Sequence, residues 1–214
     1  MVSEVAETLT TGDGVTLEAR LSAPLPPVGG VVVCHPHPLY GGDMENPVVV
    51  RIGEVCGRLG LTTLRFNFRG VGRSTGVHGD GAAEQHDVEA ALARLAAVVG
   101  AAPVGVAGYS FGAAVAANVA ARHAELAGAA LVAPPLARSE AGRLRDLDRF
   151  GDRLLVVAGS ADTICPTDAL ARLGETVPRA TVQVIDGADH FFFGKLYPLG
   201  EAVAAWARRS LLRR

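Results

Sequence analysis

The chain has 214 residues, of which 49% are hydrophobic, and its formal net charge is −2. This length and apolar content are enough for one sizeable core, so we expect a single domain over residues 1–214. The basic residues are scattered rather than concentrated, which argues against nucleic acids and anionic membrane surfaces as partners.

The amino-terminal segment has no charged stretch followed by an apolar one, and no later apolar run is long enough to span a membrane uninterrupted. These features predict a soluble, cytoplasmic protein. The three cysteines, Cys34, Cys56 and Cys165, are widely spaced and form no CxxC motif, which disfavours a disulfide framework and a zinc ribbon. We interpret them as small thiols that are buried or half-buried.

The first predicted elements form a hairpin. Gly12-Asp13-Gly14 lies between two strand-like runs within residues 5–24, and Asp-Gly is a strong signal for a tight turn between antiparallel strands. The sheet is therefore expected to begin with an antiparallel pair.

From Gly29 onward, short runs rich in valine, isoleucine and leucine alternate with helix-like stretches. The strand-like runs are 29–35, 60–68, 103–108, 128–134, 153–159 and 181–186, and the helix-like stretches are 45–60, 82–99, 111–124, 166–177 and 200–214. Continuous apolar runs predict strands that are covered on both faces. The alternation predicts an α/β fold with a mostly parallel central sheet and helices on both faces. In such sheets functional residues gather at the carboxyl ends of the strands.

The first of these runs leads into "HPHPLYGG", residues 35–42, which puts two histidines one residue apart in a loop. His35 and His37 have the spacing of a metal-ligand pair, and Asp43 and Glu45 follow closely as further candidate ligands. The alternative is a loop whose backbone contributes the chemistry. We favour the second interpretation, because a set of residues later in the chain accounts for catalysis without a metal.

The run over residues 60–68 leads into "RGVGRSTG", a glycine-rich stretch similar to a phosphate-binding loop. Thr75 occupies the position of the third glycine in G-x-G-x-x-G, so no dinucleotide cofactor is expected. Three histidines are interpreted as surface residues, namely His78 in this loop region and His86 and His123 on helix-like stretches.

The central strand-like run ends in "GYSFG", residues 108–112, and an alanine-rich helix-like stretch follows. A G-x-S-x-G sequence between a strand and a helix predicts a sharp turn that exposes its serine as a nucleophile. Gly108 and Gly112 remove the side chains that would collide in such a turn. The helix would also point its positive amino-terminal dipole at Ser110.

A serine hydroxyl is a weak nucleophile that needs a base, and the base needs an orienting group. The last two strand-like runs end in "GSADTICP" and "DGADHFFF", which put Asp162 and His190 in loops at the same edge of the sheet as Ser110. The order Ser, Asp, His is that of the α/β-hydrolase arrangement. Asp186 and Asp189 are alternatives for the acid or turn-forming residues. Asp168 falls at a helix start, where capping is the plainer role.

Two further stretches bear on a pocket. One of Phe191, Phe192 and Phe193 at most is expected to line it, because aromatic residues after a buried strand are more often packing residues. Residues 136–152 are too few for a lid domain and leave room for one short helix, so the site is expected to be open.

From about Gly29 to the carboxyl terminus the chain resembles the small serine hydrolases of the α/β-hydrolase superfamily, particularly a capless group similar to dienelactone hydrolases. The elements that carry this resemblance are "HPHPLYGG", "NFRGVGRS", "GYSFG", "GSAD" and "GADHFF". Members of that group are mostly predicted esterases or acyl hydrolases without an assigned substrate. Dienelactone hydrolases proper have a cysteine where this chain has Ser110. The resemblance makes "NFRGVGRS" the loop after the fourth strand, with Arg69 bracing neighbouring loops.

Acyl transfer through a tetrahedral intermediate needs two hydrogen-bond donors for the developing oxyanion. In this arrangement one is the N–H after the nucleophile, here that of Phe111, and the other comes from the loop after the third strand. Prolines in that loop have no N–H to offer. The resemblance nominates the backbone N–H of His37 as the second donor, with Leu39 or Tyr40 as alternatives.

The sequence therefore predicts a serine hydrolase that cleaves an ester or thioester of a small molecule without cofactor or metal. Ser110 is the expected nucleophile, His190 the base and Asp162 its orienting acid, with His37 and Phe111 forming the oxyanion hole. Acyl transfer or C–C bond hydrolysis by the same residues is the alternative within enzymes. From another class, a non-catalytic binding protein of the same fold remains open, as do the substrate and the oligomeric state.

Overall fold

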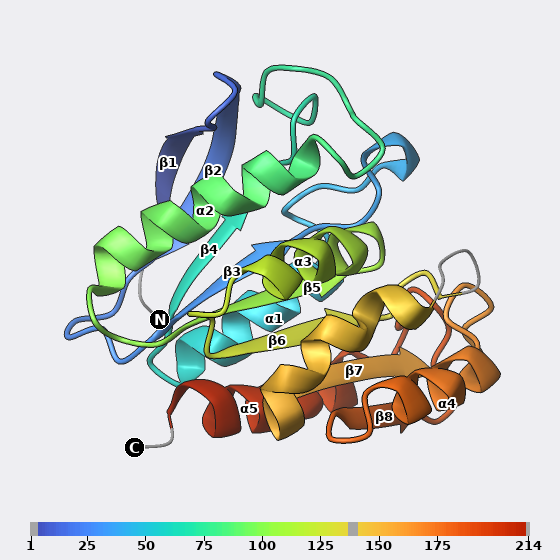
Figure 1. The fold of residues 1–214 in the computed structure, drawn as a ribbon. Helices are drawn as coiled ribbons and strands as arrows, with labels where there is room; N and C mark the ends of the chain where they lie inside the picture. Colours follow the sequence, from blue (N-terminus) through green and yellow to red (C-terminus); the bar gives the residue numbers. More distant parts are fainter. Residues whose placement is uncertain (1–3, 137–140, 213–214) are drawn as a thin grey trace.

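An eight-stranded sheet runs through the computed structural model, which describes residues 4–136 and 141–212 (Figure 1). Its strands are β1 (Val5–Thr10), β2 (Thr16–Ser22), β3 (Gly30–Cys34), β4 (Thr62–Phe66), β5 (Val104–Tyr109), β6 (Gly128–Val132), β7 (Leu154–Gly159) and β8 (Thr181–Ile185). They lie in the order β1-β2-β4-β3-β5-β6-β7-β8. The pairs β1–β2 and β2–β4 are antiparallel, and all later pairs are parallel. The predicted α/β fold with an antiparallel amino-terminal hairpin is confirmed.

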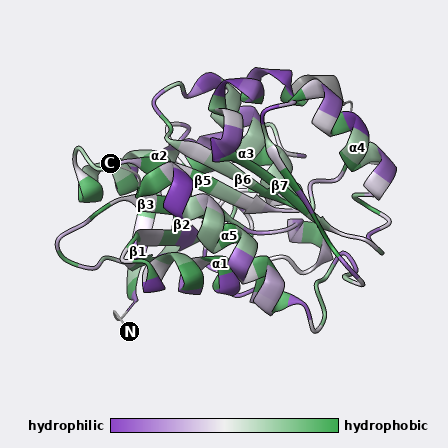
Figure 2. Cartoon of the chain, turned by 90° about the horizontal axis from the view of Figure 1, so that it is seen from below, coloured by the Kyte–Doolittle hydropathy of each residue, from purple (hydrophilic) through white to green (hydrophobic). Residues whose placement is uncertain are grey.

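Helices cover both faces of the sheet. One face carries α1 (Pro47–Arg58) and α5 (Leu196–Leu211), which contact each other, and the other carries α2 (Glu84–Val99), α3 (Phe111–Arg122), the 3₁₀ helix η2 (Ala141–Arg153) and α4 (Thr167–Thr176). Figure 2, seen from below, shows hydrophobic residues along the central strands between these two helical layers. Within residues 4–136 and 141–212, no helix is both long enough and apolar enough to cross a membrane.

The apolar runs produce buried strands because helices pack on both sides of them. Every residue of β3, β4, β6 and β7 is buried. The same expectation is wrong for β8, where Val182 and Val184 are 36% and 46% exposed. This strand forms the edge of the sheet and pairs only with β7 among the described strands, so an apolar run there does not imply full burial.

Two helical segments differ from expectation. The last helix begins at Leu196, four residues before the predicted start at Gly200. The segment before β7 holds η2, which is interrupted at Gly151 (φ 58°), rather than one short helix. Positive φ is accessible to glycine because it has no Cβ, so the chain turns there before entering β7.

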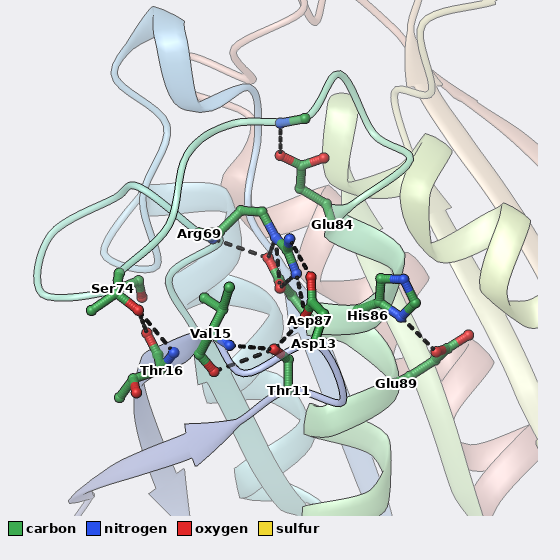
Figure 3. Close-up of polar contacts among 12 residues, drawn as sticks. Thr11, Asp13, Val15, Thr16, Arg69, Ser74, Glu84, His86, Asp87 and Glu89 are labelled. Atoms are coloured by element: carbon green, nitrogen blue, oxygen red, sulfur yellow. Dashed lines mark hydrogen bonds and ion pairs between the residues drawn. The ribbon is translucent and has the colours of Figure 1, made fainter.

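A buried ion-pair network connects the hairpin, the loop after β4 and helix α2. The Arg69 guanidinium contacts the fully buried Asp87 on α2 (2.7 Å) and Asp13 in the hairpin turn (2.8 Å), as Figure 3 shows. Asp87 also accepts the backbone N–H of Arg69 at 3.0 Å. The expectation that Arg69 braces neighbouring loops is confirmed.

Asp87→Ala should lower the free energy of unfolding by about 3 kcal/mol, because it leaves a buried guanidinium without its buried partner. Asp168→Ala is the matched control. It breaks the exposed Asp168–Arg172 pair on α4 and should change the free energy by less than about 1 kcal/mol. Urea unfolding followed by circular dichroism measures both values, and equal losses would contradict the assigned role of Asp87.

Candidate active site

Ser110 lies at the turn between β5 and α3 with φ 53° and ψ −116°. A residue with a Cβ rarely adopts a positive φ, and such strain persists only where the surroundings enforce it. The Ser110 N–H donates to Val132 O (2.8 Å), and its carbonyl accepts the N–H groups of Ala113 (3.0 Å) and Ala114 (3.2 Å). These bonds fix the turn from both sides and leave the hydroxyl at the carboxyl end of the central strand.

The two glycines of "GYSFG" allow backbone segments to touch. A Cβ on Gly108 would collide with the carbonyl of Gly112, and a Cβ on Gly112 would collide with the carbonyls of Cys34 and His35. Gly112 therefore lets the first turn of α3 pack directly on the loop after β3. The predicted reason for glycine at these positions matches the contacts.

Ser110, His190 and Asp162 come together at the carboxyl edge of the sheet. Ser110 Oγ lies 2.9 Å from His190 Nε2, and His190 Nδ1 lies 2.8 Å from Asp162 Oδ2. A carboxylate accepts hydrogen bonds, so Nδ1 carries the proton and Nε2 is free to accept the serine proton. The arrangement is able to remove a proton from the serine as it attacks an electrophile.

Asp162 is held by its own loop. Its Oδ1 accepts the backbone N–H groups of Ile164 and Cys165, each at 2.8 Å. Burial raises the pKa of this carboxyl, but the hydrogen bonds from His190 and from the two backbone N–H groups outweigh it, and the pKa lies below its ordinary value. The carboxylate is thus charged and fixed toward His190.

The other candidate acids have different partners. Asp189 Oδ1 accepts the N–H groups of Phe191 (3.0 Å) and Phe193 (3.3 Å), which is a turn-forming role. Asp186 accepts the hydroxyl of Ser160 at 3.4 Å. Asp168, in the first turn of α4, pairs with Arg172.

His35 is fully buried and bridges two loops. Its Nδ1 lies 2.6 Å from Pro36 O, and its Nε2 accepts the N–H of Phe68 at 2.9 Å. Burial lowers the pKa of His35 to about 4, so the ring is neutral with its proton on Nδ1. Both nitrogens are engaged by the backbone, which agrees with a structural loop histidine and not with one half of a metal pair.

His37 caps the short 3₁₀ helix η1 (Pro38–Tyr40). Its Nδ1 accepts the N–H of Leu39 at 3.2 Å, and its carbonyl accepts the N–H of Tyr40 at 3.1 Å. The N–H groups of Leu39 and Tyr40, the two alternative oxyanion donors, are therefore used inside the loop. The rings of His37 and Phe111 lie 4.9 Å apart between centroids, so this loop and the start of α3 are neighbours.

A pocket of about 190 Å³ is lined by Ser110 and His190 among other residues. It is lined by residues from the 36–42 loop, with Asn46, Tyr109, Ser110, Ile164, His190 and Phe191, and none of its lining residues is aspartate, glutamate, lysine or arginine. Of the three phenylalanines only Phe191 lines it, since Phe192 is buried and Phe193 is 78% exposed. A larger groove of about 340 Å³ on β1 and β2 shares no residue with it.

Two residues beside this site differ from the prediction, since His78 was expected at the surface and Tyr109 was not expected to take part. The interpretation of His78 as a surface residue is wrong, because its side chain is only 9% exposed. Its position in a glycine-rich loop suggested exposure, but that loop folds back onto α3. Tyr109, next to the serine, donates its hydroxyl to His190 O at 2.9 Å. Only its place in "GYSFG" pointed to it.

The fold and this cluster define the class of α/β serine hydrolases. Residues 31–196 match the family description of the alpha/beta hydrolase domain, and the chain belongs to this family. An uncharacterized protein of Rickettsia prowazekii is 31% identical over 192 residues, which cover 86% of this chain and 80% of that protein.

Solved structures agree with this membership. XC6422 from Xanthomonas campestris, described as an α/β serine hydrolase without lid, is 32% identical, with a TM-score of 0.86 over 100% of this chain and 98% of that chain. An α/β serine hydrolase homologue from Coxiella burnetii is 31% identical, with a TM-score of 0.85 over 96% of this chain and 98% of that chain. The predicted superfamily is thereby confirmed.

Gly112→Ala should lower the free energy of unfolding by about 2 kcal/mol, because the new Cβ meets backbone carbonyls that have no room to move. Gly57→Ala, also within a helix, is the control. Outside its chain neighbours and its own helix backbone, no atom of the described residues lies within 4 Å of a Cβ at Gly57, so this change should raise stability by about 0.5–1 kcal/mol through helix propensity. Thermal and urea unfolding measure both, and a stabilising Gly112→Ala would refute the contact.

Proposed function

We propose that this protein is a serine hydrolase that cleaves an ester or thioester through an acyl-enzyme intermediate. The observation that carries the proposal is the hydrogen-bonded series Ser110, His190 and Asp162 at the strained turn before α3. The 31–32% identical relatives described as serine hydrolases support the same class.

In the acylation step Ser110 Oγ attacks the acyl carbonyl while His190 Nε2 takes the hydroxyl proton. The tetrahedral intermediate collapses when His190 returns that proton to the leaving alcohol or thiol, which leaves the acyl group on Ser110. Water then attacks the acyl-enzyme, with His190 again as base, and the carboxylic acid is released. Asp162 holds the imidazole in the required tautomer and stabilises its positive charge in both steps.

The oxyanion of each intermediate is assigned to the backbone N–H groups of Phe111 and His37. Phe111 opens α3, and the first N–H groups of a helix have no partner within the helix. The helix dipole adds positive potential at the same point. Support for His37 comes from its place in the loop that packs on α3 and from the use of the Leu39 and Tyr40 N–H groups elsewhere.

The pocket supports a small, uncharged acyl group as substrate. Its volume of about 190 Å³ is below the range of pockets that bury drug-sized ligands, roughly 300–1,000 Å³. Its lining contains no aspartate, glutamate, lysine or arginine that could pair with an anionic or cationic acyl chain. Acyl transfer to another acceptor and C–C bond hydrolysis use the same residues and are distinguished by product analysis.

Ser110→Ala should abolish covalent labelling by a fluorophosphonate and lower ester hydrolysis on the order of a thousandfold or more, because the nucleophile is lost. The substrate panel should contain esters and thioesters with acyl chains of increasing length and with a terminal carboxylate. Ser210→Ala, near the end of α5, is the control for a serine substitution. Undiminished turnover by folded Ser110→Ala would exclude the mechanism.

Asp162→Asn should lower turnover on the order of a thousandfold, because the amide no longer fixes the proton on His190 Nδ1. Asp189→Asn, in the neighbouring turn, should cost less than about tenfold, since among the described residues the Asp189 side chain accepts hydrogen bonds from the backbone N–H groups of Phe191 and Phe193. Steady-state kinetics on both variants decide between them. A greater loss in Asp189→Asn than in Asp162→Asn would show that the acid is misassigned.

A further inference from the structure

A buried carboxylate closes the loop that leads from β4 to α2. Glu84 is fully buried at the start of α2, and its two oxygens accept the backbone N–H groups of Gly79 and Gly81, each at 2.8 Å. Figure 3 shows the carboxylate pointing up into this loop. Burial raises the pKa of Glu84, but these backbone hydrogen bonds outweigh it, and the pKa lies below its ordinary value. The loop is therefore fixed by a charged group beneath it.

His78 lies in this loop, against the same carboxylate. Its Nδ1 is 2.9 Å from Glu84 Oε1, and its Nε2 is 3.4 Å from Asp80 Oδ1. Neither ring nitrogen makes a well-aligned hydrogen bond with the described residues, so the ring is held by packing and by its close contact with the Glu84 carboxylate. The His78 side chain is only 9% exposed, yet among the described residues it caps no helix and joins no strand through a hydrogen bond. Its packing contacts are therefore the place to look for its role.

The His78 ring packs on the two residues that supply the proposed oxyanion donors. Its centroid lies 4.8 Å from that of His37 and 5.3 Å from that of Phe111. Gly81, whose N–H Glu84 accepts, also lies beside Phe111, because a Cβ on Gly81 would be 3.5 Å from the Phe111 ring. One anchored loop thus contacts both sides of the proposed oxyanion hole.

The loop after β3 needs such support, because its outer residues face solvent. Leu39 and Tyr40 are 71% and 83% exposed, so the Tyr40 ring, whose centroid lies 4.8 Å from that of His37, is itself supported little by other side chains. Oxyanion stabilisation depends on donors that are fixed before reaction, and small displacements of reacting groups are costly. Besides the backbone contacts of Gly112, the His78 ring is a buried contact that both donor residues share.

We propose that His78, anchored by Glu84, is a positioning residue that holds His37 and Phe111 so that their N–H groups converge on the oxyanion. The proposal rests on the proposed function of the same site. Packing alone would change only stability, whereas positioning of the donors changes the energy of the tetrahedral intermediate. Measurements of kcat and of the affinity for a trifluoromethyl ketone distinguish the two roles, because the adduct of the ketone with Ser110 carries an oxyanion. Positioning changes both quantities, and packing alone changes neither in the folded protein.

The experiment compares His78→Ala, His78→Phe and the control His86→Ala on the full chain. His86 is a second histidine beside a glutamate, paired with Glu89 at 3.6 Å, but it is exposed on α2. In folded His78→Ala, kcat should fall by about tenfold or more and the ketone should bind more weakly by a similar factor, with KM within about twofold. His78→Phe, which restores a flat ring, should recover most of kcat, and His86→Ala should match the wild type.

Wild-type kcat and ketone affinity in folded His78→Ala would overturn the positioning role while hydrolysis by the wild type still stands. Absence of both hydrolysis and fluorophosphonate labelling in the wild type would instead overturn the proposed function. Where His78→Ala fails to fold, Glu84→Gln decides, because it keeps the side-chain shape but replaces one of the two oxygens that hold Gly79 and Gly81 in the loop of His78. A several-fold lower kcat with unchanged KM supports the proposal, and wild-type kcat in that variant rejects it.

Discussion

Direct contact between backbone segments is the constraint on which the site depends. Gly112 packs against the carbonyls of Cys34 and His35, and Gly108 packs against the carbonyl of Gly112. Because no side chain separates these segments, the loop after β3 and the start of α3 keep one spacing. Pairing of Cys34 with Gly108 in the sheet continues the same contact. The positive φ of Ser110 is tolerated because these neighbours leave the turn no relaxed alternative.

A second close contact brings the acid and the base together at the other end of the site. Gly159 ends β7, and a Cβ there would collide with Ala188 in the loop after β8. The N–H of Ala161 donates to the Ala188 carbonyl at 2.9 Å. The loops that carry Asp162 and His190 are therefore joined through their backbones before their side chains meet. Strands β7 and β8 are parallel, with Gly159 opposite Ile185, so these two loops leave the sheet side by side.

Chain order, apolar runs and the GYSFG motif were sufficient to predict the sheet and to place Ser110, Asp162 and His190 at one edge of it, because parallel strands bring the loops at their carboxyl ends together. They were insufficient for β8 and for His78. An apolar run is the same in sequence whether its strand is central or at the edge, so the exposure of Val184 was not predictable. The path of the loop that buries His78 depends on Glu84 and Phe111, which are distant from each other in sequence, and no motif links either of them to His78.

The buried polar groups that order the site lie beneath its loops and not among the residues that line its pocket. His35 ties the loop after β3 to the N–H of Phe68, and the Asn67 side chain accepts the N–H of Met44 at 2.9 Å. Glu84 holds the later part of the loop after β4 through the N–H groups of Gly79 and Gly81. A capped enzyme orders its site by closing over the substrate. Here the described residues between β6 and β7 form only η2, which is not a cap. The loops around the site therefore have to be ordered before substrate binds. Buried hydrogen-bonded groups beneath the pocket provide this order, and because they do not line the pocket they make no contact with the substrate.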